Sequence, residues 1–120
     1  MISATGKGIR VDSEGDGNYG ASRGIHKHNG IDELCDEGQN IRAKFDMKIE
    51  RISYPNSDMV MQGIAWSSGK SEGRMFYFIP DKYLIGKEVK EYDIIGIAQS
   101  VSKYYGLPNM KDHIHFQINK

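Results

Sequence analysis

The residues best suited to chemistry are the histidines, which fall into two short clusters near opposite ends of the chain. One cluster spans residues 26–32 and reads HKHNGID, and the other spans residues 112–115 and reads DHIH. Zinc favours imidazole nitrogen and carboxylate oxygen, and a catalytic zinc site usually has three protein ligands with water in the fourth position. Two histidines and one aspartate could therefore bind a zinc ion that activates water for hydrolysis.

The spacing inside each cluster is compatible with one shared metal ion. On a strand, His113 and His115 point to the same face about 6.6–6.8 Å apart, so one can bind the metal while the other faces its water. His28 and Asp32 flank a glycine, and a turn there can bring both side chains to the same ion. Such pairs also arise by chance, so spacing alone leaves a metal site and coincidence as equal alternatives. His26 is assigned no role.

Strand patterns must position these clusters. Apolar and polar residues alternate over residues 41–48, and apolar runs follow at 60–66, 75–79 and 93–101. Alternation over residues 113–118 places both histidines of the second cluster on one face and three apolar residues on the other. No segment shows a long helical period.

The pattern predicts an all-β fold, namely a small antiparallel sheet or sandwich with little helix and with long loops that form an open groove. Glycine is abundant, with 14 residues, which favours tight turns between short strands. We expect residues 1–120 to form a single domain, in which residues 1–24 are an irregular N-terminal arm and residues 102–111 are a loop.

Composition excludes several classes of partner. The chain has 16 basic and 16 acidic residues, so it has no bulk attraction to nucleic acid or to an anionic membrane. It has one cysteine, which allows no intrachain disulfide, and no apolar run of the length that a signal peptide or membrane span needs. We expect a monomer that binds neither nucleic acid nor membrane, and that is phage-associated or released by a non-classical route.

Two motifs resemble those of the lysostaphin-type, LytM-like zinc metalloendopeptidases. Residues 28–32 (HNGID) match the pattern H-x-G-[IV]-D, and residues 113–116 (HIHF) match H-x-H-F near the end of that domain. Residues 18–24 resemble the F-G-x-R approach to the site, and residues 87–96 resemble a V-K-x-G-x-x-I-G turn and strand. The resemblance runs over residues 8–118.

Within this superfamily, the sequence of the chain is most similar to the vertebrate leukocyte chemotaxin branch, which is regarded as retaining zinc without peptidase activity. The likeness lies in residues 32–35, 75–77 and 82–83 and in the second histidine motif. Compact phage versions of the domain are also similar. The absence of a disulfide set disfavours a secreted vertebrate protein.

The resemblance implies the roles of four residues. His28, Asp32 and His115 match the zinc ligands, and His113 matches the catalytic histidine of the second motif. The family normally has one more histidine, in a Y-x-H stretch between the motifs. This chain has no histidine from residue 29 to residue 112.

Other candidate residues depend on the same resemblance. Phe78 or Tyr77 stands near the place of the missing histidine. The hydroxyl of Tyr77 could donate to an oxyanion, and a simple core position is the alternative. Tyr19 and Tyr105 are candidate groove residues, and Arg23 could bind a substrate carboxylate. Cys35 follows the first motif, and we predict that it is not a metal ligand.

The resemblance favours a zinc-dependent endopeptidase that hydrolyses peptide bonds of bacterial peptidoglycan and lyses cell walls, possibly phage-encoded. The alternative is a catalytically lapsed, zinc-containing module that recognises cell-wall or receptor ligands. A β domain that binds no metal would require both histidine clusters to be coincidental.

Overall fold

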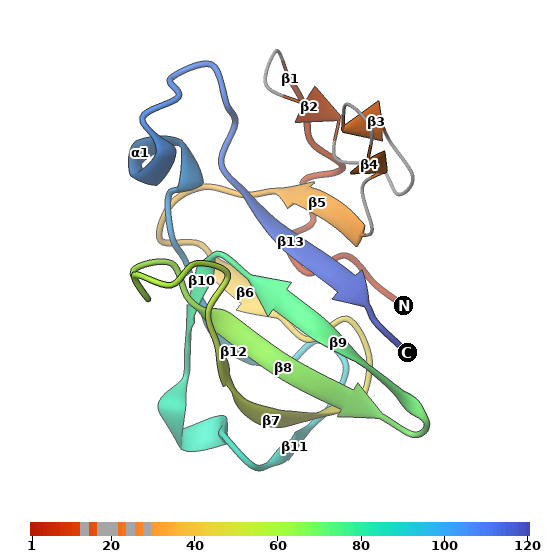
Figure 1. Ribbon diagram of the computed structural model, residues 1–120. Coiled ribbons are helices and arrows are strands. Elements are labelled where there is room, and N and C mark those ends of the chain that lie inside the picture. Colours follow the sequence, from red (N-terminus) through yellow and green to blue (C-terminus); the bar gives the residue numbers. More distant parts are fainter. Residues whose placement is uncertain (13–14, 17–21, 24–25, 28–29) are drawn as a thin grey trace.

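The computed structural model describes residues 1–12, 15–16, 22–23, 26–27 and 30–120. Antiparallel strands dominate these residues, as the sequence predicts, and two sheets form the body of the molecule (Figure 1). The helices are one turn of 3-10 helix, η1 (Lys82–Leu84), and one short α-helix, α1 (Val101–Tyr105). In the described part of the chain, neither helix has the length and apolar character needed to cross a bilayer.

The larger sheet has six strands in the order β11-β7-β8-β9-β13-β5, and the smaller sheet has three in the order β10-β12-β6. The strands of the larger sheet are β5 (Gly30–Leu34), β7 (Met47–Ser53), β8 (Gly63–Ser68), β9 (Ser71–Phe76), β11 (Glu88–Val89) and β13 (His113–Ile118). The strands of the smaller sheet are β6 (Asn40–Arg42), β10 (Phe78–Pro80) and β12 (Ile94–Ala98). Two short pairs lie in the arm: β1 (Val11–Asp12) with β2 (Gly15–Asp16), and β3 (Ser22–Arg23) with β4 (His26–Lys27).

The core lies between the two sheets and leaves the other face of the larger sheet open for function. Trp66 of β8 and Phe116 of β13 stack with their ring centroids 5.4 Å apart, and Phe45 packs edge-on against both rings. Ile41 and Ile95 contribute buried side chains from the smaller sheet. Alternation along β13 explains this division, because Phe116 faces the core while His113 and His115, at the alternate positions, face away.

The strand predicted over residues 41–48 is divided between the two sheets. β6 ends at Arg42 and β7 begins at Met47, so the chain crosses from the smaller sheet to the larger one between them. Lys44, which strict alternation places outside, is instead buried and pairs with Glu33 of β5. A buried ion pair therefore overrides the simple pattern at the crossing.

The apolar run over residues 75–79 is divided in the same way, at Tyr77. This residue has a positive φ of 80°, and the chain passes there from β9 of the larger sheet to β10 of the smaller one. The backbone amides of Tyr77 and Phe78 both donate to the carbonyl of Gln62, which holds the corner. Non-glycine residues rarely adopt this conformation, so the break could not be predicted from the residue types.

The segment predicted as a loop over residues 102–111 begins with part of α1. The side chain of Ser100 caps the helix by accepting a hydrogen bond from the amide of Lys103, and Gly106 ends it in the left-handed conformation. Five residues are too few to display a helical period, which explains why the pattern missed it.

Candidate functional site

The site begins where β5 and β13 pair, because the antiparallel register sets Asp32 directly opposite His115. The Nδ1 atom of His115 lies 2.8 Å from the Oδ1 atom of Asp32. His113, two residues earlier on the same face, has its Nε2 atom 3.7 Å from Oδ2 of Asp32. The structure therefore brings together three of the residues that the two motifs predicted.

Gly30 explains why the first motif contains a glycine at this position. A Cβ atom on Gly30 would lie 2.3 Å from the carbonyl oxygen of Phe116 and 2.9 Å from Cε1 of His115. Both distances are far below van der Waals contact. The absence of a side chain thus allows β5 to approach β13 closely and leaves room for the imidazole of His115.

Arg10 is a buried partner of Asp32 that the sequence did not reveal. Its guanidinium donates to Oδ2 of Asp32 at 2.9 Å, and its backbone amide donates to the carbonyl of the same residue at 2.9 Å. The two side chains are only 3% and 4% exposed. This pairing places a positive charge beside the carboxylate of Asp32 and fixes its direction.

The geometry fixes the tautomer of His113. Its Nδ1 atom lies 2.8 Å from the carbonyl oxygen of Lys111, and a carbonyl can only accept, so Nδ1 carries the proton. Nε2 is then left as an acceptor that faces Asp32. Burial lowers the pKa of His113, although the nearby carboxylate of Asp32 opposes this shift. A neutral imidazole at pH 7 follows, which is the form that a general base needs.

Tyr77 lies at the site and not in the apolar core. Its ring meets the ring of His113 edge-on, with centroids 5.5 Å apart. Burial raises the pKa of Tyr77, and a hydrogen bond with Tyr105 raises it further. Tyr105 also accepts a hydrogen bond from the amide of Asn56 at 3.2 Å. The hydroxyl of Tyr77 is therefore neutral and belongs to a polar chain that links the corner at Tyr77, the end of α1 and the loop that contains Asn56.

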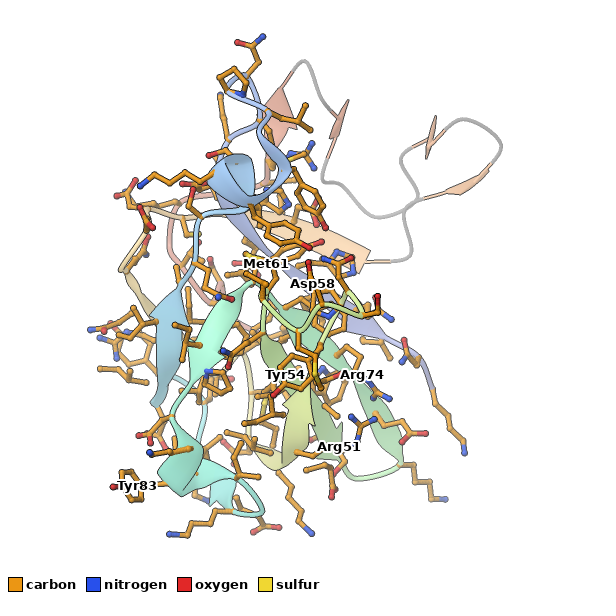
Figure 2. All side chains as sticks on the ribbon, turned by 60° about the vertical axis from the view of Figure 1, so that its left-hand side comes forward. Arg51, Tyr54, Asp58, Met61, Arg74 and Tyr83 are labelled. Atoms are coloured by element: carbon orange, nitrogen blue, oxygen red, sulfur yellow. The ribbon has the colours of Figure 1, made fainter. Side chains whose placement is uncertain are left out.

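These residues line an open cleft of about 420 Å³ on the face of the larger sheet that points away from the core. Tyr54 and Pro55 form one wall, and α1 and the loop after it contribute Tyr105 and Met110. The remaining lining residues are Arg10, Asp32, Phe76, Tyr77, His113, His115 and Gln117. Figure 2 shows Tyr54 and the loop that carries Asp58 and Met61 over this face.

The donor atoms around His115 fit a metal ion. Nε2 of His115 lies 2.8 Å from Oε1 of Gln117, whose own amide nitrogen donates to Asn119, so that nitrogen of the imidazole carries a proton. Nδ1 faces the carboxylate of Asp32, so either a proton or a metal cation between these two atoms would satisfy both. A metal ion in place of the Nδ1 proton would satisfy the same oxygen.

The fit requires only a small shift. Tetrahedral zinc with ligand distances of about 2.0–2.2 Å separates its donor atoms by roughly 3.3 Å, compared with the 2.8 Å between Asp32 and His115. Among the described residues, no three His, Cys, Asp or Glu side chains form a complete metal-binding group. The predicted third ligand, His28, lies outside the described residues.

The remaining predicted residues have different outcomes. Tyr105 lines the cleft as predicted, whereas Tyr19 and the side chain of Arg23 lie outside the described part of the structure. Cys35 belongs to the core cluster, and burial raises its pKa to about 12, which opposes formation of the thiolate that a metal would bind. The alternation over residues 113–118 does not reveal the contact between Gln117 and His115.

Comparison with known proteins places the chain among named relatives. No family model matches it. The chain is 32% identical over 108 residues to leukocyte cell-derived chemotaxin-2 of Bos taurus, and the match covers 88% of this chain and 69% of the relative. The protein of the same name from Mus musculus is also 32% identical over 108 residues, with the same coverage of both chains.

Proposed function

This chain belongs to the leukocyte cell-derived chemotaxin-2 family, and we propose that it is a zinc-containing module that binds a peptide in its cleft without cleaving it. The ligand is an extended segment of a cell-wall or receptor molecule, laid across the open face of the larger sheet. The relatives are named as chemotaxins, and binding to a receptor would be the equivalent role here.

The observation that carries this proposal is the state of Tyr77. The resemblance to the lysostaphin-type enzymes places a histidine near this position, where it would stabilise an oxyanion. The hydroxyl of Tyr77 instead forms a hydrogen bond with Tyr105. Loss of one oxyanion donor typically lowers the rate by about 10²–10³. Among the described residues, the cleft thus retains groups that can bind and orient a peptide, while the hydroxyl of Tyr77 is not a free donor for the reaction.

Zinc would be held by Asp32 and His115, with His28 as the expected third ligand. Once bound, the metal would supply a Lewis acid that attracts a carbonyl or carboxylate oxygen of the ligand. Arg10 and Gln117 keep Asp32 and His115 in the required directions, as outer-shell partners of metal ligands usually do. The wall of the cleft excludes water from one side of the bound peptide.

Peptide-bond hydrolysis is the second candidate, and the tautomer of His113 favours it. Nε2 of His113 is an unprotonated acceptor that faces Asp32, and burial keeps the imidazole neutral. In that reaction His113 would take a proton from water and pass it to the leaving amine. Hydrolysis and binding would therefore use the same arrangement of residues in the cleft.

The experiment that separates the two candidates uses zinc-loaded protein and peptidoglycans of several bridge chemistries. The binding proposal expects sedimentation of the protein with the polymer and no released peptide. It is wrong if the native protein releases peptides and the His113→Ala variant, which keeps its zinc and fold, does not. That outcome would establish the endopeptidase.

A further inference from the structure

Two arginines lie side by side on the open face of the larger sheet, beyond the end of the cleft. Arg51 of β7 and Arg74 of β9 are both paired in register with Ala65 of β8, so all three side chains leave the sheet on the same face. Two strand spacings separate the arginines by about 9.6 Å at the backbone. Figure 2 shows both over the same strands as Tyr54.

Neither guanidinium is neutralised within the part of the chain that the structure describes. Arg51 donates only to the carbonyl of Ile52 at 3.4 Å, and Arg74 only to that of Gly73 at 3.1 Å. Both carbonyls belong to neighbouring residues in sequence, so these bonds leave most donors of each guanidinium available.

Two glutamates on the strands beside the arginines already have cationic partners. Glu50 lies 3.6 Å from Lys48 and also accepts a hydrogen bond from Ser67. Glu72 lies 3.9 Å from Lys120. The positive charge of the two arginines is therefore in excess, and the two glutamates bound the basic area along the strands.

The arginines continue the line of the candidate site. Arg74 stands opposite Gln117 in the register, just as Phe76 stands opposite His115. Alternate residues of a strand are about 6.8 Å apart. Arg74 lies beside Gln117, so it is one such spacing beyond His115, the candidate metal ligand, along the direction of β13. Gln117 lines the cleft and contacts His115, so it joins the two places.

We propose that Arg74 and Arg51 form a subsite for a single carboxylate side chain of an extended peptide whose backbone lies in the cleft. This inference rests on the proposed function of the cleft as a peptide-binding site. Guanidinium groups recognise a carboxylate through parallel hydrogen bonds, and two of them on a flat face can converge on one acid. Convergence of two guanidinium groups on one acid favours a single acidic residue in the ligand over a repeating polyanion.

The test uses the zinc-loaded chain of residues 1–120 and blocked heptaglycine peptides that carry one glutamate at each interior position in turn, with glutamine versions as partners. We expect one glutamate position to bind about tenfold more tightly than its glutamine partner, the size of one charge-assisted hydrogen bond. The double variant Arg51→Gln/Arg74→Gln should lose this preference and bind the glutamine peptide as the native protein does. The charge-matched variant Lys82→Gln/Lys87→Gln should keep it.

The outcomes separate the subsite from the proposed function. Equal binding of glutamate and glutamine peptides, or a preference that survives in the double variant, overturns the subsite and leaves peptide binding intact. Tighter binding of polyglutamate or of an oligonucleotide than of any single-glutamate peptide also overturns it. Binding of no peptide by the native protein contradicts both proposals, whereas cleavage that retains the arginine-dependent preference contradicts only the non-catalytic function.

Discussion

The buried pair of Arg10 and Asp32 leads to a quantitative prediction about the link between stability and zinc. Replacement of Arg10 by methionine keeps most of the apolar volume and removes the guanidinium. Because the two side chains are 3% and 4% exposed, the carboxylate of Asp32 would be left buried beside an apolar group. Removing one partner of a buried ion pair typically costs about 3–5 kcal/mol.

This loss is a large part of the stability of a small domain, which is typically about 5–15 kcal/mol. We expect Arg10→Met without zinc to unfold at a clearly lower urea concentration than the native protein. The slope of the free energy of unfolding against urea concentration should be unchanged. Saturating zinc should reduce the difference, because the metal supplies positive charge to the same carboxylate and binds only the folded chain. The measurement is urea unfolding followed by fluorescence of Trp66, with and without zinc.

The matched control is Arg51→Met, which removes an exposed guanidinium that has no carboxylate partner in the described residues. Its free energy of unfolding should change by less than about 0.5 kcal/mol. A loss below about 1 kcal/mol for Arg10→Met would refute the reasoning, since Asp32 would then not depend on this cation. An equal loss with and without zinc would show that the metal does not bind at Asp32.

Three further predictions follow from the packing around the site. Phe116→Ala should lower the free energy of unfolding by about 3–5 kcal/mol in urea titrations, because it removes the ring that stacks on Trp66; a loss below about 1 kcal/mol would contradict this packing. Gly30→Ala should weaken zinc binding in competition with a chelator, since its Cβ would press on His115, and unchanged affinity would count against the close approach. The raised pKa of Cys35, about 12 compared with 9, means that its contribution to stability is present below pH 9 and is lost as pH rises through 12. Cys35→Ala should lack that alkaline decrease when unfolding is followed from pH 8 to 12, and identical profiles for the two proteins would contradict the shift.

The sequence was most informative where one pattern carried both burial and chemistry. Alternation over residues 113–118 correctly predicted that Phe116 packs in the core while His113 and His115 share the open face. The strand period alone fixes this division. The position of Asp32 opposite His115 was harder to predict from the sequence, because 83 residues separate them and only the register of β5 with β13 brings them together.

Other features could not be predicted because they depend on contacts between distant segments. Arg10 reads as an ordinary arm residue, yet it is buried against Asp32. Lys44 reads as the outer face of a strand, yet it is buried against Glu33. A charged residue enters the interior only where a specific partner compensates it, and single-sequence patterns do not identify partners.

Tyr77 illustrates a third kind of limit. In the sequence, Tyr77 lies near the place of the missing histidine, and both a catalytic role and a position in the core were open alternatives. Its positive φ turns the chain between the two sheets and directs the ring toward His113. Backbone conformations of this type carry no signal in composition or periodicity, so only the fold distinguished the two alternatives.

The central claim, that Asp32 and His115 hold zinc in the cleft, is tested most directly by metal content. Protein purified without added metal should be analysed by mass spectrometry for zinc, together with His115→Ala and with Cys35→Ala as the control. The account predicts one zinc per chain in the native and Cys35→Ala proteins and a strong loss in His115→Ala. Native protein without zinc, or zinc retained in full by His115→Ala, would contradict it.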